Sequence, residues 1–391
     1  EKPFEGINGS GKHNNWSIST NTGENLLDPG KTPDQNIQFL VFLMAVIKAV
    51  DEYADLMRVS AASAGNDHRL GGNEAPPAIV SIFLGDELTA VLKSIEEDTY
   101  FDEHQSVQLE TGAHVLPHFM KDNTDRNRTS PFAFTGNKFE FRMLGSSASV
   151  ATPNIILNTA VAEALSQFAK ELEGTAPEDM EHAVHELIKR AIKKHKKVIF
   201  NGNGYTEEWV EEAKKRGLYN LESTPDCLPQ FISDKNVELF TKHHIFTKEE
   251  IFSRYEILLE NYVKTIGIEA KTMKEMLTKD FLPAVSSYAA SVSDNALAMK
   301  ALAPSVPTAS AESLVSSLGD AYEKISSALS TLDEEIQEID KKGSMQESAD
   351  YCHKTVLATM DELRAAADEA EAKIPDEELP YPTYDALLFS V

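Results

Sequence analysis

Three clusters of polar side chains in this sequence have residue types suited to catalysis. They are the glycine-rich loop that ends at His13, the loop that contains Arg69 and Glu74, and the segments that contain Arg128, Glu140 and Arg142. An imidazole and a carboxylate suit a divalent cation, guanidinium groups suit phosphoryl or carboxylate groups, and a carboxylate on a loop can close over a site. This inventory is typical of phosphoryl transfer from a metal-bound nucleotide, in which the protein mainly positions groups and neutralises charge.

The first loop, Gly6–His13, is one residue away from the phosphate-binding pattern G-x-x-x-x-G-K-[ST]. That pattern needs a Ser or Thr hydroxyl for magnesium and a helix directly after the loop. Here His13 takes the place of the hydroxyl, and the mixed polar and β-branched residues 14–20 are typical of a strand. We therefore reject the phosphate loop and expect a loop that lets the backbone approach a ligand closely, with an imidazole that can bind a metal.

The third cluster is predicted to lie on two strands, 132–134 and 138–142, joined by a turn at 135–137. Because side chains alternate along a strand, Lys138, Glu140 and Arg142 should share one face and two phenylalanines the other. Three charges on one face indicate either a solvated sheet surface or the floor of an active site.

Helices and one further strand are predicted around these clusters. A helix is expected over 32–62, with Thr32 as its cap and Pro33 at its first position, and a buried strand over 78–85. Further helices are expected over 154–172, 177–197, 247–265 and 267–300, and the basic residues 189–197 should form a solvated helix face. Apolar stripes over 314–339 and 345–367 predict an antiparallel helical hairpin.

Composition excludes several classes of partner. The 391 residues carry a net charge of −26 and the pI is about 4.8, which argues against nucleic acid and anionic membranes. The longest apolar run, 39–50, is too short to span a bilayer. Two cysteines in no metal-binding spacing, Cys227 and Cys352, argue against a disulfide scaffold and favour a reducing, cytoplasmic location.

The order and wording of four motifs resemble the glutamine synthetases. The family pattern K-P-x-x-G-x-N-G-S-G-x-H is similar to residues 2–13, and H-x-[HN]-x-S continues through Asn15 and Ser17. Three further family motifs follow in the same order. Arg69–Pro76 resembles an arginine followed by G-x-E-A-P, Asn127–Thr129 resembles N-R-S, and Glu140–Arg142 resembles a strand with E-x-R. The spacing and the long helical tail most resemble the type III bacterial members.

The resemblance implies a role for each matched residue. His13 and Glu140 would bind Mg²⁺ or Mn²⁺. Asn8, Gly9 and Arg69 would bind the substrate, Arg142 would bind substrate and stabilise the transferring phosphoryl group together with Arg128, and Glu74 would close the site and accept a proton from ammonium. The nucleotide-binding residues would be Asn15, Ser17 and Arg128, with Lys138 as a further contact.

The resemblance also implies the overall function and fold. The activity would be ATP-dependent ligation of ammonia to L-glutamate through γ-glutamyl phosphate, in a large cytoplasmic homo-oligomer that is a double-ring dodecamer in the family. The alternatives are a γ-glutamyl-amine ligase and a non-catalytic helix-rich assembly subunit. The fold would be α+β: the C-terminal half of a glutamine-synthetase-like catalytic domain with an antiparallel sheet (1–175), a helical continuation (176–305), and a helical hairpin with a tail (306–391).

Three departures from the family pattern affect these expectations. The Arg69–Glu74 spacing is one residue shorter than in the usual bacterial pattern, and Ala133 stands where an arginine is expected, with Lys138 as its substitute. The family's remaining metal-binding carboxylates would precede Glu1, so we expect that an N-terminal part is missing and that this chain does not turn over alone. The pair His114 and His118 is a less favoured metal site, because its segment is irregular.

Overall fold

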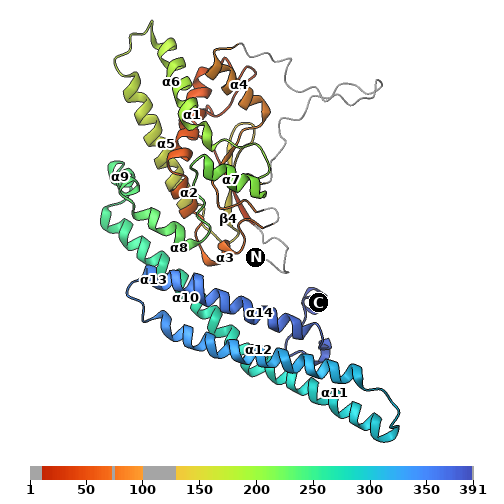
Figure 1. Ribbon diagram of the computed structural model, residues 1–391. Helices are drawn as coiled ribbons and strands as arrows, with labels where there is room; N and C mark the ends of the chain where they lie inside the picture. The colour runs from red at the N-terminus through yellow and green to blue at the C-terminus, as the bar shows by residue number, and fades with distance from the viewer. Residues whose placement is uncertain (1–10, 73–74, 100–128, 390–391) are drawn as a thin grey trace, which may run out of the picture. The chain divides into compact units, whose positions relative to one another are not determined.

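The computed structural model describes residues 11–72, 75–99 and 129–389 of the chain. The chain divides into two compact units, residues 1–255 and 256–391. The division predicted from the sequence, with boundaries after residues 175 and 305, stays a prediction. Unit 1 contains a small sheet and its helices, and unit 2 is helical (Figure 1). The α+β class with a mainly helical C-terminal region is therefore confirmed.

The sheet of unit 1 has the strand order β1-β4-β3-β2. Its strands are β1 (Gly11–Trp16), β2 (Ile82–Phe83), β3 (Phe132–Phe134) and β4 (Phe139–Gly145). β4 pairs antiparallel with both β1 and β3, as the predicted hairpin requires, whereas β2 pairs parallel with β3. The sheet is thus mixed at one edge, and the strand expected over 78–85 contributes only two residues to it.

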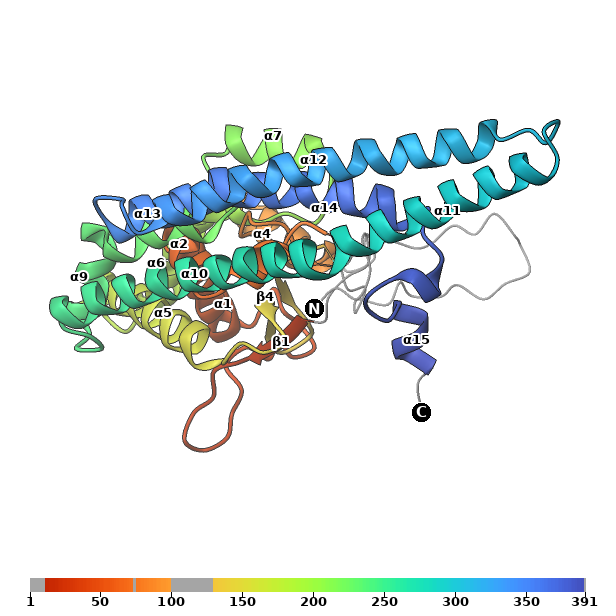
Figure 2. The ribbon, with the colours of Figure 1, turned by 90° about the horizontal axis from the view of Figure 1, so that it is seen from below.

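One face of this sheet packs on two helices, α1 (Ile37–Glu52) and α5 (Ala151–Leu172), which Figures 1 and 2 show side by side. The phenylalanines of β3 and β4 form this face, with the rings of Phe132 and Phe139 stacked at 4.6 Å. From β1, Asn14 and Trp16 donate to Asn154 and Asn158 of α5 at 2.7 and 2.8 Å. The opposite face of the sheet is therefore the one on which the predicted charged side chains lie.

The predicted helix over 32–62 is wrong at its start and in its continuity. Asn36, not Thr32, caps α1, because its side chain accepts the backbone N–H of Phe39 at 3.0 Å. The helix is interrupted at Tyr53 (φ −123°) and resumes as α2 (Ala54–Val59) and α3 (Ala64–Asp67). Its apolar centre is buried as predicted, since Leu43 to Ile47 are fully inaccessible to solvent.

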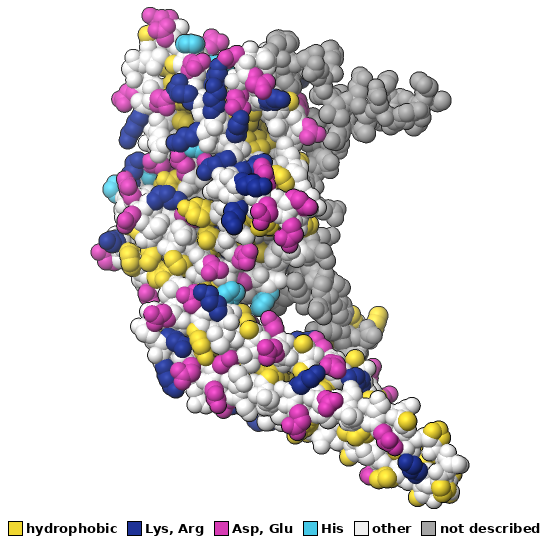
Figure 3. All heavy atoms as spheres, in the orientation of Figure 1, with side chains coloured by type: hydrophobic (Ala, Val, Ile, Leu, Met, Phe, Trp, Pro, Cys, Tyr) yellow, Lys and Arg dark blue, Asp and Glu magenta, His cyan; other side chains and the backbone are white. Residues whose placement is uncertain are grey.

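The remaining helices of unit 1 enclose this core. They are α4 (Asp86–Glu97), α6 (Met180–His195), α7 (Glu207–Lys215), α8 (Thr224–Cys227) and α9 (Asp234–Lys242), and α10 (Lys248–Met276) continues into unit 2. Figure 3 shows basic side chains interspersed with acidic ones on the face with α4 and α6. The basic cluster 189–197 is not simply solvated, because Lys189 and Lys196 pair with Asp98 and Glu96.

Unit 2 is built from long packed helices. They are α11 (Leu282–Leu302), α12 (Ala309–Ile339), α13 (Met345–Tyr351), α14 (Leu357–Glu371) and the short α15 (Tyr384–Phe389). α12 and α14 pack together after the chain reverses at 340–344, and most of the apolar stripe on each is buried. No helix in the described part of the chain has the length and hydropathy that a bilayer span requires.

Candidate active site

Two predicted metal ligands from distant parts of the chain meet on the face of the sheet opposite α1 and α5. His13 on β1 and Glu140 on β4 are 127 positions apart, yet His13 Nδ1 lies 2.9 Å from Glu140 Oε1. The pairing of β1 with β4 causes this, because Asn15 stands opposite Glu140 and the register shifts between Lys12 and Asn14. The imidazole is half exposed and the carboxylate is only 8% exposed.

Arg142 holds the other oxygen of the same carboxylate. Its Nη2 and Nε lie 2.7 and 2.9 Å from Glu140 Oε2, and both side chains are buried. Burial alone would raise the pKa of Glu140, but the ion pair with Arg142 and then the contact with His13 outweigh it, so the pKa lies below its ordinary value. Glu140 is thus a carboxylate at neutral pH, as a metal ligand must be.

The predicted nucleotide-binding residues within the described chain lie near one end of the β1/β4 pair. Asn15 is exposed and stands opposite Glu140. Ser17 donates from Oγ to Asn25 Oδ1 at 2.6 Å and has a longer contact, 3.1 Å, with the carbonyl of Asn137. Lys138 is exposed, directly before β4. By strand alternation these side chains share the face of His13 and Glu140.

Arg69 lies at the other end of the β1/β4 pair and is 6% exposed. Its Nη1 donates to the carbonyl oxygens of Met143 and Leu144, both at 3.2 Å, and its Nη2 donates to that of Arg142 at 3.3 Å. Burial lowers the pKa of its guanidinium. The structure therefore brings Arg69 to the backbone of the strand that carries Glu140 and Arg142.

Several predicted residues lie outside the described residues: Asn8, Gly9, Glu74, Arg128 and the alternative pair His114 and His118. Ala133 is described. It pairs with Glu140 across β3 and β4 and is fully buried, so a methyl group occupies the position of the expected arginine.

Sequence reasoning missed two residues at the base of this site, Asn66 and Gly11. Asn66 is 4% exposed and its Oδ1 accepts from Arg69 Nη1 at 3.3 Å. A Cβ on Gly11 would lie 2.0 Å from Arg69 Nη2, so only glycine leaves room for this guanidinium. The available signals were the i, i+3 spacing of Asn66 and Arg69 on one helical turn and the third glycine of the opening loop.

The donor set fits a divalent cation in part. A neutral imidazole nitrogen and an ionised carboxylate oxygen suit Mg²⁺ or Mn²⁺, but these ions take about six ligands. Within the described ranges no group of three or more His, Cys, Asp or Glu side chains is placed to hold a metal. His13 and Glu140 can thus supply two ligands, and the others would come from substrate oxygens, water or further residues.

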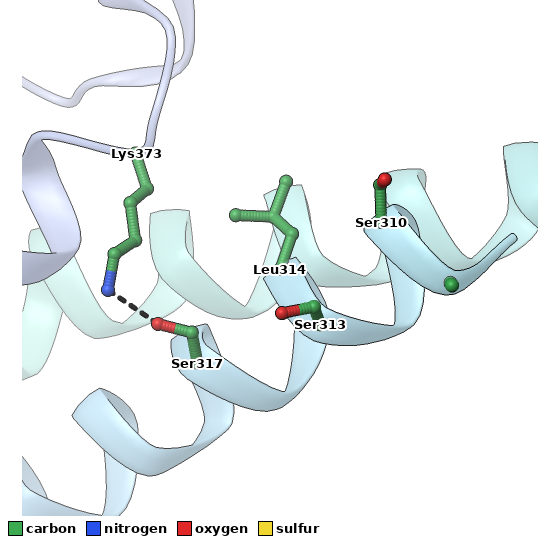
Figure 4. A pocket seen from close by; sticks show the side chains of 6 residues that line it. Ser310, Ser313, Leu314, Ser317 and Lys373 are labelled. Atoms are coloured by element: carbon green, nitrogen blue, oxygen red, sulfur yellow. Dashed lines mark hydrogen bonds between the residues drawn. The ribbon is translucent and has the colours of Figure 1, made fainter.

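Two open grooves of the described chain contain none of the predicted site residues. One, of about 540 Å³, lies in unit 2 between the start of α12 and Lys373, and Figure 4 shows Lys373 pointing to Ser317. A second, of about 390 Å³, is lined by residues between Thr241 and Glu250. The candidate site therefore lies in neither of these two grooves.

Comparison with known proteins finds relatives over the whole chain. Residues 183–300 match the family model of the glutamine synthetase C-terminal domain. The chain is 53% identical over 392 residues to a glutamine synthetase of Butyrivibrio fibrisolvens, 43% over 397 to a type-3 glutamine synthetase of Dictyostelium discoideum, and 37% over 399 to a glutamine synthetase of Bacteroides fragilis (strain YCH46). Each match covers 100% of this chain but only 56%, 54% and 55% of the relative, so the chain spans about half the length of the curated relatives it matches.

Proposed function

We propose that this chain, which belongs to the glutamine synthetase family, provides part of the active site of an enzyme that ligates ammonia to L-glutamate with ATP. The family assignment draws on two separate parts of the sequence, since the motifs lie within residues 2–142 and the family model matches 183–300. The observation that carries the functional proposal is the meeting of His13 and Glu140 at 2.9 Å, with Arg142 on the same carboxylate.

In the proposed reaction the γ-carboxylate of glutamate attacks the γ-phosphorus of ATP, ADP leaves, and γ-glutamyl phosphate forms. Ammonium first loses one proton, ammonia attacks the activated carbonyl carbon and phosphate leaves, and the attached nitrogen loses a second proton as the amide forms. A Mg²⁺ or Mn²⁺ ion held by His13 and Glu140 would neutralise charge on the nucleotide phosphates. Arg142 keeps Glu140 ionised and adds positive charge beside the place where the phosphoryl group would be transferred.

The contacts of Arg69 are compatible with its proposed role at the substrate carboxylate. Both terminal nitrogens bind the carbonyl oxygens of β4, whereas Nε has no partner among the described residues. Nε is therefore the nitrogen of this guanidinium that is left for a carboxylate oxygen, and because Nε is buried, the substrate would have to enter beside it. Asn8, Gly9, Glu74 and Arg128 complete the proposal by family resemblance alone, and Asn15, Ser17 and Lys138 are the proposed nucleotide contacts.

The proposal extends to assembly. By family resemblance alone, the enzyme would form a large homo-oligomer in which neighbouring subunits complete each site. Light scattering on the full-length protein tests this part, because a monomeric active enzyme would contradict it.

The experiment that tests the function uses the full-length protein with glutamate, ATP and either Mg²⁺ or Mn²⁺, and measures release of ADP together with formation of glutamine. Replacing ammonium with methylamine or ethylamine separates the rivals: preference for the larger amine would indicate a γ-glutamyl-amine ligase. Absence of both ADP release and Mn²⁺ binding would indicate a non-catalytic subunit and overturn the proposal.

A matched pair of histidine variants makes the metal assignment specific. His13 and His185 are equally exposed, at 50% and 48%, but His185 lies on α6 away from the sheet. His13→Ala should weaken Mn²⁺ binding in calorimetric titration by about tenfold or more, because one ligand of the ion is lost. His185→Ala should leave it unchanged. Equal Mn²⁺ affinity in the two variants would remove His13 from the metal site.

A further inference from the structure

We propose that Asn66 is a positioning residue for glutamate binding, which acts by fixing the Arg69 guanidinium against the carbonyl oxygens of β4. The inference rests on the proposed function and names a residue outside the four family motifs. Asn66 lies on α3, between the helices that pack under the sheet and the loop that begins at Arg69.

Every hydrogen-bonding group of the Asn66 side chain is used. Its Nδ2 donates to the carbonyl oxygens of Ala61 at 2.7 Å and Met143 at 2.8 Å, and its Oδ1 accepts from Arg69 Nη1 at 3.3 Å. The backbone N–H of Asn66 is in turn accepted by the capping side chain of Ser63. The carboxamide thus joins the end of α2, the strand β4 and the Arg69 side chain.

Together, the Asn66 and Arg69 side chains donate hydrogen bonds to three consecutive carbonyl oxygens of β4, those of residues 142–144. Of the two glycines that stand opposite each other at this end, Gly11 on β1 and Gly145 on β4, it is Gly11 that leaves room for the Arg69 guanidinium. A Cβ on Gly11 would overlap the guanidinium, and one on Gly145 would contact Asn66 Oδ1 at 3.5 Å. The position of Arg69 is therefore set by Asn66 and the strand backbone.

The loop that follows Arg69 begins directly after these hydrogen bonds. The N–H of Gly72 donates to the carbonyl of Arg69 at 3.2 Å, and that of Gly71 donates to the carbonyl of Pro76 at 3.0 Å. Loss of the Asn66 side chain would therefore release both the guanidinium and the base of the 70–76 loop. The predicted nucleotide contacts lie toward the opposite end of the β1/β4 pair, where Trp16 stands opposite Phe139.

The test compares Asn66→Ala and Asn66→Asp with Asn236→Ala in the full-length protein. Asn236 is a matched control: it is fully buried in unit 1, and its Nδ2 also makes two hydrogen bonds, to Asp55 Oδ2 and the carbonyl of Gln230. Asn66→Asp keeps an acceptor for Arg69 but removes both donors and places a carboxylate oxygen against the carbonyl oxygens of Ala61 and Met143, so the side chain should be displaced and function should not be rescued.

Both Asn66 variants should raise the KM for glutamate about tenfold or more while the KM for ATP changes less than about twofold. The reason is that the substitutions free the Arg69 side chain at one end of the β1/β4 pair and leave the predicted nucleotide contacts at the other end in place. Asn236→Ala should leave both values unchanged in the folded fraction. Hydrogen exchange should become faster over 70–76 in the Asn66 variants and not in the control.

Equal KM values for glutamate in Asn66→Ala and Asn236→Ala, with an active wild-type enzyme, would overturn the inference and leave the proposed function intact. A wild-type protein that forms no glutamine would overturn the proposed function, and with it a role of Asn66 in glutamate binding. Hydrogen exchange would then still decide whether Asn66 holds the loop.

Discussion

Replacing Gly11 by alanine tests the geometry at the base of the site most directly. The new Cβ would lie 2.0 Å from Nη2 and 2.7 Å from Cζ of Arg69, both far inside van der Waals contact. It would also lie 3.3 Å from the backbone carbonyl oxygen of Leu144, which cannot move without distorting β4. The guanidinium is the flexible partner, so it must leave its place by about 1 Å or more.

The energetic cost follows from what the guanidinium gives up. It makes contacts of 3.2–3.3 Å with Asn66 Oδ1 and the carbonyl oxygens of residues 142–144. Hydrogen bonds to charged groups contribute about 1.5–3 kcal/mol each, but these are long and share two nitrogens, so we expect a total loss of about 2–3 kcal/mol. At about 2–4 °C per kcal/mol, the transition that unfolds unit 1 should fall by about 4–12 °C.

Calorimetry or thermal circular dichroism measures this shift, with Gly65→Ala as the control. Gly65 lies in α3, has open space where its Cβ would be and has no left-handed backbone, so alanine should be neutral or stabilise by about 0.4–1 kcal/mol. In an Arg69→Ala background Gly11→Ala should lose most of its cost, because its clash partner is gone. An undiminished cost in that background would refute the contact between Gly11 and Arg69.

Two further predictions concern stability away from the site. Burial would raise the pKa of Glu163, but its contacts with Lys242, Gln167 and His243 lower it to about 2, so this carboxylate stabilises the fold above pH about 4.5 and its contribution is lost as pH falls toward 2. Glu163→Gln should therefore reduce the change in the free energy of unfolding across that pH window by roughly 2–3 kcal/mol, and the melting temperature should depend less on pH there. An unchanged pH profile would contradict the assignment. In unit 2, Ile325→Ala removes a fully buried side chain and should cost about 2–5 kcal/mol in denaturant unfolding, while Leu302→Ala, at a 90% exposed position, should change stability by less than about 0.5 kcal/mol.

Strand alternation was enough to predict the charged face of the site. The period of two along β4 separates Glu140 and Arg142 from Phe139 and Phe141, and the structure packs the two phenylalanines into the core. Alternation alone left open whether the charged face was solvent or active site. The order of four motifs that resemble those of the glutamine synthetases favoured an active site, and this assignment of the charged face stays a prediction.

The hydrogen bonds that hold the site together could not be predicted in the same way. Asn66 and Arg69 bind backbone carbonyl oxygens 73–77 positions away, and a carbonyl is present at every residue whatever its type. Such contacts leave no periodic pattern in the sequence. The start of α1 was missed for a related reason: Thr32 and Asn36 are both good caps, and the burial of Phe39 and Leu40 favours the second.

The arrangement around Glu140 has a consequence for how a metal would bind. Oε2 is held by Arg142, so Oε1, which contacts His13, is the oxygen available to an ion. If His13 and Glu140 held an ion, it would take the place of their direct contact, so both side chains would need little movement. Because Mg²⁺ and Mn²⁺ take about six ligands, two protein donors give weak binding until nucleotide phosphates or further carboxylates are added. Metal affinity should therefore depend on bound nucleotide, and equal Mn²⁺ affinity with and without ADP would show that the protein alone completes the site.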